Sequence, residues 1–96
     1  MKAYVIIRVE IEDPTLLKDY QAAAPAAIEK YNGKIIVRAG SIINLEGPED
    51  SRRTIIIEFS SLADAEIFYK SPEYTDACKL RADIGKFEIF AIEGTS

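Results

Sequence analysis

Residues 4–11 read Tyr-Val-Ile-Ile-Arg-Val-Glu-Ile, and apolar side chains fill every second position of this stretch. Because successive side chains of a β-strand point to opposite faces, the alternation predicts a strand with two different faces. One face is wholly apolar: Val5, Ile7, Val9 and Ile11. The other face is mixed: Tyr4, Ile6, Arg8 and Glu10. The apolar face of such a strand packs under helices. The mixed face carries both apolar and charged side chains, and its partner must be identified separately.

The residues after this strand predict a helix. Asp13 can cap the free N–H groups at a helix start, and Pro14 suits the first turn because its missing N–H has no partner to lose. Apolar residues then recur at helical spacing over residues 14–31. Pro25 lies inside this helix and should kink it. Asn32-Gly33 ends it, with the glycine free to take the left-handed cap conformation.

Three further strands are predicted from β-branched and aromatic residues. Residues 34–39 and 41–45 form the second strand, with a bulge or bend at Gly40. Residues 53–59, Arg-Thr-Ile-Ile-Ile-Glu-Phe, form the third strand. Residues 86–93 form the last one.

A second helix in two pieces is predicted between the last two strands. Ser60 or Ser61 caps a helix over residues 62–70. Ser71-Pro72 then restarts the helix in the same way as Asp13-Pro14, and this second piece runs to about residue 82.

The element order is therefore β-α-β-β-α-β. Short connections and right-handed crossovers close such a chain into an α+β fold of the ferredoxin-like kind. This fold is a four-stranded antiparallel sheet of order 4-1-3-2 with helices on one face. Ninety-six residues suit one core, so we expect residues 1–96 to form a single domain.

Composition excludes several kinds of partner and location. The net charge is −4, whereas a nucleic-acid-binding protein needs a basic stripe. The longest basic run, Arg52-Arg53, is explained by a solvated loop. Cys78 is the one cysteine, so no intrachain disulfide can form, and no apolar run is long enough for a signal peptide or membrane span. We expect a cytoplasmic protein with no nucleic-acid or membrane partner.

The mixed face of the sheet predicts a homodimer. It carries five large apolar side chains: Ile6, Ile36, Ile56, Phe90 and Ile92. A contiguous patch of this kind is larger than monomers usually expose. Burying it contributes about 7–15 kcal/mol, against an association cost of about 4–15 kcal/mol. We expect two copies to meet through this open sheet face; the alternative is a half-exposed sheet with scattered surface isoleucines.

Three charged residues of the same face form the candidate ligand-binding site. Their even-numbered positions place Arg8, Arg38 and Glu58 away from the helices, inside the predicted dimer. Two guanidinium groups and one carboxylate leave a spare positive charge, which suits a small anionic ligand. A structural ion-pair network is the alternative.

Other chemistry has less support in the sequence. The chain has no histidine, which excludes a Ser-His-Asp triad, a Cys-His pair and a histidine metal site, and it has no glycine-rich phosphate loop. We expect no cofactor and no metal. Tyr20, Tyr31 and Tyr74 lie on apolar helix faces, which favours core packing over catalysis. Cys78 has no base or activating cation nearby in the sequence and is expected to be a buried, inert thiol.

Several segments resemble a small bacterial family called domain of unknown function 1330, over nearly the whole chain. They are Tyr4-Val5-Ile6-Ile7-Arg8-Val9, Tyr20 to Tyr31 with Ala24-Pro25-Ala26-Ala27, Arg38-Ala39-Gly40, Glu58-Phe59 and Ser71-Pro72-Glu73-Tyr74. The family more often has two glycines after the arginine, where this chain has Gly40 and Ser41. The resemblance implies the dimeric α+β barrel superfamily, whose paired sheets enclose a cavity.

Known members of that superfamily include cofactor-free monooxygenases, isomerases and haem-degrading enzymes, but a shared fold does not carry their activities over. We expect a small-molecule-binding homodimer. Its activity is either cofactor-independent catalysis on an acidic or aromatic metabolite, or binding without a reaction. The alternative function is a non-catalytic structural or regulatory dimer with an interior ion-pair network.

Overall fold

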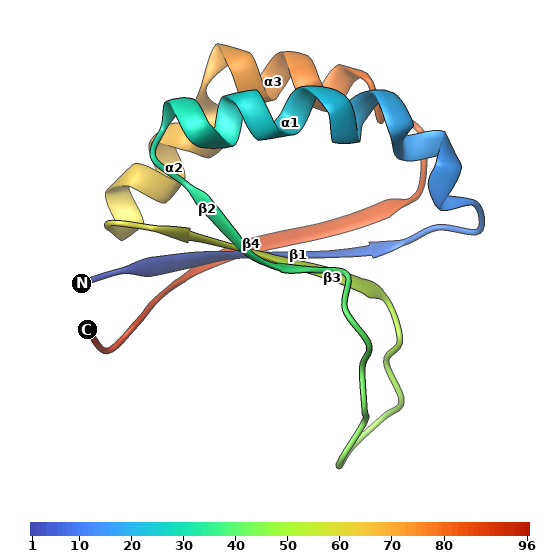
Figure 1. The fold of residues 1–96 in the computed structure, drawn as a ribbon. Coiled ribbons are helices and arrows are strands. Elements are labelled where there is room, and N and C mark those ends of the chain that lie inside the picture. The colour runs from blue at the N-terminus through green and yellow to red at the C-terminus, as the bar shows by residue number, and fades with distance from the viewer.

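The computed structural model describes residues 1–96 and has two layers, a four-stranded antiparallel sheet and a layer of helices on one of its faces (Figure 1). The strands are β1 (Ala3–Glu10), β2 (Lys34–Arg38), β3 (Arg53–Phe59) and β4 (Lys86–Glu93). Their order across the sheet is β2-β3-β1-β4, which confirms the predicted ferredoxin-like arrangement. Strand β1 lies in the middle, paired with β3 on one side and β4 on the other.

The helical layer consists of a short 3-10 helix η1 (Pro14–Leu17) and helices α1 (Lys18–Lys30), α2 (Leu62–Lys70) and α3 (Pro72–Lys79). Three predicted caps are present. The Asp13 side chain accepts a hydrogen bond from the Thr15 amide, and Ser61 accepts one from the Asp64 amide. Ser71 separates α2 from α3: its hydroxyl accepts from the Tyr74 amide and donates to the Phe68 carbonyl.

Two helix ends differ from the sequence-based expectation. Helix α3 ends at Lys79, a turn earlier than expected. At the end of α1 the left-handed conformation belongs to Asn32, with φ of 63°, and not to Gly33. Gly33 is needed there for a different reason, because a Cβ atom would lie 2.7 Å from the Phe59 ring. Pro25 does not end α1, which continues through it.

The core lies between the sheet and the helices, as predicted. Its largest fully buried side chains are Ile57 and Phe59 from β3, Phe68 from α2 and Tyr74 from α3. The odd-numbered residues of β1 are also buried, which confirms the two-faced strand. Helix α2 packs on β1, β3 and β4, whereas the main neighbour of α1 is α3. Helix α1 thus lies over the sheet without sealing the space beneath it.

A β-bulge in β2 changes the direction of the side chains at its end. Ile35 pairs with Ile57, but Val37 pairs with Ile56, so Ile36 is an extra residue in β2. Directly opposite residues of an antiparallel pair share a face, and a bulge therefore reverses the alternation after it. Val37 therefore lies on the open face, whereas simple alternation from Ile35 predicts that it packs under the helices. The predicted strand over 41–45 is wrong, because β2 ends at Arg38. The bulge lies at Ile36 and not at Gly40, and the chain bends one residue before Gly40, at Ala39 with φ of 50°.

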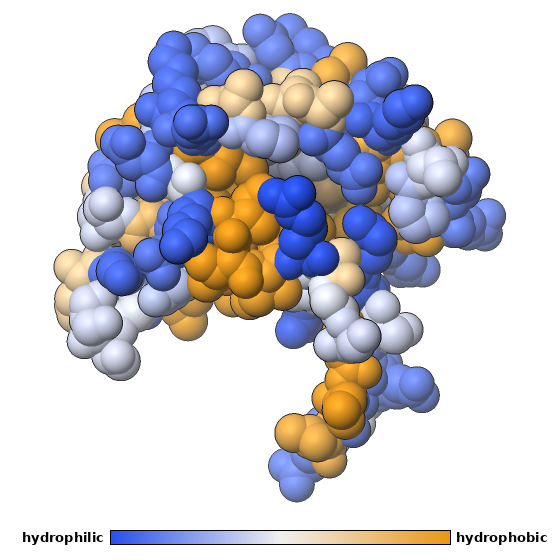
Figure 2. All heavy atoms as spheres, in the orientation of Figure 1, coloured by the Kyte–Doolittle hydropathy of each residue, from blue (hydrophilic) through white to orange (hydrophobic).

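Residues 39–52 form a loop between β2 and β3 that projects from the sheet on the side opposite the helices (Figure 1). Ile43 and Leu45 on this loop are 81% and 90% exposed. Figure 2 shows apolar residues along this projection. The open sheet face beside it carries exposed Phe90 and Ile92. No helix in the structure combines the length and apolar character required to cross a membrane.

Candidate functional site

A cavity of about 400 Å³ lies between α1 and the helix-covered face of the sheet. Its walls are mostly apolar, with Leu17, Ala24 and Ile28 on the helix side and Ile7, Ile55 and Ile57 on the sheet side. Ala24 is buried in the middle of α1 and lines the cavity, and its small side chain does not fill the gap to the sheet. The volume falls in the range of small-molecule pockets, about 300–1,000 Å³.

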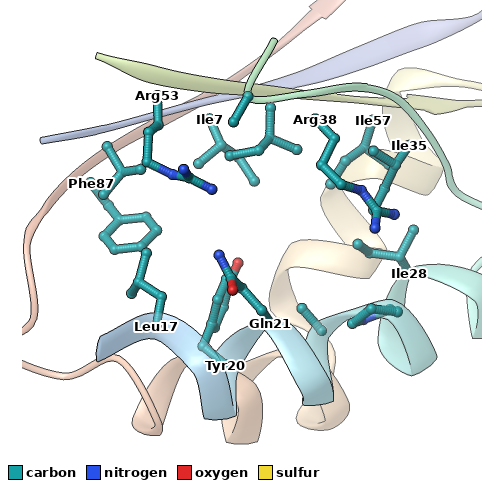
Figure 3. A pocket seen from close by; sticks show the side chains of 15 residues that line it. Ile7, Leu17, Tyr20, Gln21, Ile28, Ile35, Arg38, Arg53, Ile57 and Phe87 are labelled. Atoms are coloured by element: carbon teal, nitrogen blue, oxygen red, sulfur yellow. The ribbon is translucent and has the colours of Figure 1, made fainter. Parts of the chain in front are cut away.

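Two arginines bring positive charge to this cavity. Arg38 from the end of β2 and Arg53 from the start of β3 both line it. In Figure 3 both side chains extend from the sheet side, Arg53 near Phe87 and Arg38 near Ile28. Arg38 reaches the cavity because the bulge pairs it with Ile55, which also lines it. The two guanidinium groups therefore enter one space from adjacent strands.

Neither cavity arginine has an acidic partner. Every ion pair in the structure involves other residues. The Nε atom of Arg53 is buried and has no hydrogen-bond acceptor. A buried donor without a partner carries a desolvation cost of about 1–3 kcal/mol, and more when it is charged. The cavity thus has an excess of positive charge and unused donors.

The acidic residues that could have neutralised these arginines lie on the open face. Asp50 contacts Arg52 at 2.8 Å and Arg8 at 3.3 Å, and Glu88 contacts Arg52 at 2.9 Å. The hydrogen bonds from Arg52 lower the pKa of Asp50 from 3.8 to about 2. This network ties the end of the 39–52 loop to β1 and β4.

The structure does not bring the three predicted ligand-binding residues together. Arg8 is on the open face with Asp50, and Glu58 is on the same face but pairs with Lys2 at 3.5 Å. Arg38 is on the opposite face of the sheet. The expectation that all three side chains point into one space is wrong, because simple alternation along β2 fails at the bulge. A ligand-binding role for each residue stays a prediction.

Sequence reasoning missed Arg53. The Arg52-Arg53 pair was explained by a solvated loop, but Arg53 begins β3 and Arg52 belongs to the open-face ion network. Alternation along β3 indicates the direction of Arg53. This residue is odd-numbered like Ile55 and Ile57, whose side chains face the helices. A charged residue at such a position is a reason to look for a pocket.

Tyr20 on α1 and Tyr74 on α3 form a buried pair next to the cavity. Tyr20 and Tyr74 are buried, as the core-packing prediction required, and their hydroxyl oxygens lie 2.6 Å apart. Burial raises the pKa of both phenols. Tyr20 lines the cavity and Tyr74 lies behind it, outside the lining. The third tyrosine, Tyr31, is half-buried and donates a hydrogen bond to Glu73 at 2.6 Å.

The surroundings of Cys78 differ from the expectation. Its side chain is half-buried, not buried, and the Nη2 atom of Arg81 donates a hydrogen bond to its sulfur at 3.2 Å. The Arg81 guanidinium also stacks over the Phe87 ring, 3.9 Å from the ring centre. The thiol therefore has a cation beside it, which no spacing in the sequence indicated.

Comparison with solved structures shows the same fold in distant relatives. A protein of unknown function from Rhodopseudomonas palustris superposes with a TM-score of 0.73 at 16% identity, covering 99% of this chain and 83% of that one. A dimeric ferredoxin-like protein of unknown function from Bacteroides fragilis gives 0.59 at 20% identity, covering 97% and 94%. A variant of SnoaB, a cofactor-independent oxygenase from Streptomyces nogalater, gives 0.68 at 9% identity, covering 99% and 94%.

Sequence comparison identifies the family. No match was found among curated proteins. The model of the family described as domain of unknown function DUF1330 matches residues 2–95. This match confirms the resemblance of the segments discussed above, and it spans every strand and helix of the fold. The chain therefore belongs to the DUF1330 family.

Proposed function

We propose that the cavity under α1 binds a small organic anion, with its charged group held by Arg53 and Arg38. The observation that carries this proposal is the buried Nε of Arg53, a donor without an acceptor, on the wall of a cavity of about 400 Å³. An anion that enters the cavity can accept hydrogen bonds from the exposed edge of the Arg53 guanidinium group and neutralises the excess charge. Guanidinium groups bind carboxylates and phosphates through paired hydrogen bonds, which makes two of them an effective anion clamp.

The apolar walls of the cavity determine which uncharged part of a ligand can bind. Because most lining residues are apolar, the body of the ligand must be apolar as well. An aromatic or aliphatic carboxylic acid meets both requirements, whereas inorganic phosphate or a sugar phosphate leaves the walls without a partner. SnoaB shares this fold, but an identity of 9% concerns the fold alone, so we propose binding and no reaction.

We further propose that the chain forms a homodimer through the open sheet face. Ile6 and Ile56 lie opposite each other in the middle of that face, and Phe90 and Ile92 are about half exposed on β4. The loop residues Ile43 and Leu45 project on the same side. A second copy gives these side chains an apolar surface to pack on, and two of the structural relatives are themselves described as dimeric. The partner in this proposal is a second copy of the chain.

Arg8 and Glu58 have a different role in this proposal. Both lie on the open face in ion pairs, Arg8 with Asp50 and Glu58 with Lys2. Their pairing supports the alternative left open by the sequence, a network of ion pairs within the dimer. Arg38 and Arg53 carry ligand binding in their place.

Calorimetric titration tests the binding proposal. We expect 3-phenylpropanoate and octanoate to bind wild-type protein, and Arg53→Gln to weaken both by about tenfold or more, the usual effect of losing a charged hydrogen bond. Arg8→Gln is the matched control, because it removes the same group from the opposite face. Equal affinity in wild type and Arg53→Gln, or no binding to wild type, would refute the proposal.

A further inference from the structure

The buried hydroxyl groups of Tyr20 and Tyr74 carry two protons, but the hydrogen bond between them uses only one. The Tyr20 and Tyr74 oxygens are 2.6 Å apart, and either hydroxyl can be the donor. Burial raises the pKa of both phenols, so both stay protonated at neutral pH. The pair therefore has two protons, of which one lies between the oxygens. The Arg81 guanidinium lies close to both oxygens, but no other group of the protein accepts a hydrogen bond from either of them.

The surroundings of the pair do not accept the second proton. The nearest charged group is the Arg81 guanidinium, which lies 5.3 Å from the centre of the Tyr20 ring. A guanidinium group only donates hydrogen bonds. Cys78 lies nearby, but its sulfur already accepts from Arg81. The spare proton therefore either forms a hydrogen bond to a bound molecule or has no acceptor.

Burial decides which hydroxyl carries the spare proton. If Tyr20 donates to Tyr74, the free proton belongs to Tyr74, which is 1% exposed and does not line the cavity. If Tyr74 donates to Tyr20, the free proton belongs to Tyr20, which does line it. Leaving a buried donor unsatisfied costs about 1–3 kcal/mol. The second orientation avoids this cost once an acceptor is present in the cavity.

The Tyr20 ring is held in place on two sides. It makes edge-to-face contacts with Tyr74, at 6.2 Å between ring centres, and with Phe87, at 5.9 Å. Such aromatic contacts favour one ring orientation. In Figure 3, Tyr20 rises from α1 while Arg38 and Arg53 enter from the sheet. The tyrosine hydroxyl and the two guanidinium groups therefore approach a bound molecule from different sides.

From these observations we infer that the Tyr20 hydroxyl, oriented by a hydrogen bond from Tyr74, donates to a neutral oxygen of the ligand. This inference rests on the proposed function and narrows the ligand class to acids with a second oxygen, a ketone or a hydroxyl group, beyond an apolar body. The carboxylate contacts Arg53 and Arg38, and the second oxygen contacts Tyr20. A second carboxylate does not fit this end, because Tyr20 offers one neutral donor and no ion pair.

Matched pairs of acids test the inference by calorimetry. The pairs are 4-oxo-4-phenylbutanoate with 4-phenylbutanoate, and 5-oxo-5-phenylpentanoate with 5-phenylpentanoate, which differ only in one ketone oxygen. We expect wild-type protein to bind at least one keto acid about tenfold more tightly than its partner, the effect of one good hydrogen bond. Tyr20→Phe should remove this preference and leave the affinity for the acid without the ketone unchanged.

Two further variants serve as controls. Tyr31→Phe removes a hydroxyl with an equally short hydrogen bond, to Glu73, outside the cavity, and should keep the preference. Tyr74→Phe keeps the Tyr20 hydroxyl and should retain at least part of it. A Tyr20→Phe variant that weakens both acids of a pair equally would show a merely structural role and overturn the inference.

The remaining outcomes separate the inference from the proposed function. Binding that depends on Arg53 but shows no keto preference in either pair overturns the role of Tyr20 and leaves the anion site standing. Failure of all four acids to bind wild-type protein overturns both.

Discussion

Arg38 and Ile55 lie directly opposite each other on β2 and β3, and both side chains line the cavity under α1. This pairing exists because Ile36 is an extra residue in β2, which shifts every later residue of the strand to the other face. The same shift places Val37 opposite Ile56 on the open face. One irregularity in a five-residue strand therefore brings Arg38 to the cavity that Arg53 also lines.

Exchanging the two residues after the bulge should weaken ligand binding. In the double variant Val37→Arg/Arg38→Val, the composition is unchanged but the guanidinium group points away from the cavity. We expect carboxylate affinity to fall about tenfold, by the loss of one charged hydrogen bond. Calorimetry measures this, with circular dichroism to verify that the fold is kept.

Deletion of Ile36 is the matched control for that exchange. Removing the extra residue regularises β2 but preserves the pairing of Arg38 with Ile55, so carboxylate affinity should stay within about threefold of wild type. If the deletion lowered the affinity as much as the exchange, the bulge itself would be required and the face reached by Arg38 would not explain the effect.

Replacing Arg53 by an apolar residue should stabilise the ligand-free protein. The Arg53→Met variant removes a buried Nε without an acceptor and keeps the aliphatic stem that packs on the cavity wall. Replacing a half-buried, incompletely paired charge by a hydrophobic residue is often stabilising, so we expect the free energy of unfolding to rise by about 1 kcal/mol. Urea denaturation measures it. A loss of about 1 kcal/mol or more would indicate that Arg53 is a structural residue.

The fold could be predicted from the sequence because its signals are local. Strand β3 and strand β4 begin and end at the predicted residues, and Asp13, Ser61 and Ser71 cap the helices as expected. Each of these features depends on residues within one turn or one strand. Alternation along a strand and capping at a helix start are both readable without knowing which segments pair.

The candidate site could be predicted only in part, because it depends on pairing between strands. The bulge at Ile36 is defined by its position against Ile56 and Ile57, and nothing in residues 34–38 alone marks it. The direction of Arg38 depends on this bulge, so alternation gave the wrong face. The direction of Arg53 follows from simple alternation in β3, whose start at Arg53 is predicted correctly, so the sequence alone indicates that this arginine faces the helices.

The anchor of the 39–52 loop should weaken in acid. Hydrogen bonds from Arg52 lower the pKa of Asp50 from 3.8 to about 2, so the folded state favours the ionised carboxylate. A lowered folded-state pKa contributes stability above the unfolded pKa and loses it as the pH falls through the folded pKa. Thermal melts should therefore show a stability difference between wild type and Asp50→Asn at pH 5 that shrinks between about pH 4 and pH 2. A difference that stays constant down to pH 2 would contradict the ion-pair anchor.

Cys78 should be dispensable for binding and cost little when truncated. Its side chain is half-buried on α3 and outside the cavity lining, so Cys78→Ala should lower the free energy of unfolding by about 1 kcal/mol or less and leave carboxylate affinity unchanged. Urea denaturation and calorimetry measure both effects. Rapid labelling of the native thiol at neutral pH would instead show that the neighbouring Arg81 activates it.

A charge in the middle of the open sheet face should prevent the proposed dimer. Ile56 lies opposite Ile6 on that face, and the Ile56→Asp variant would bury a carboxylate with no cation opposite it. We expect sedimentation velocity to show a dimer for wild type and a monomer or unfolded chain for the variant. Ile67→Asp is the matched control, because Ile67 is 55% exposed on α2, away from the sheet face, and this variant should remain a dimer. A dimer that survives Ile56→Asp, or one that dissociates in Ile67→Asp, would place the interface elsewhere on the molecule.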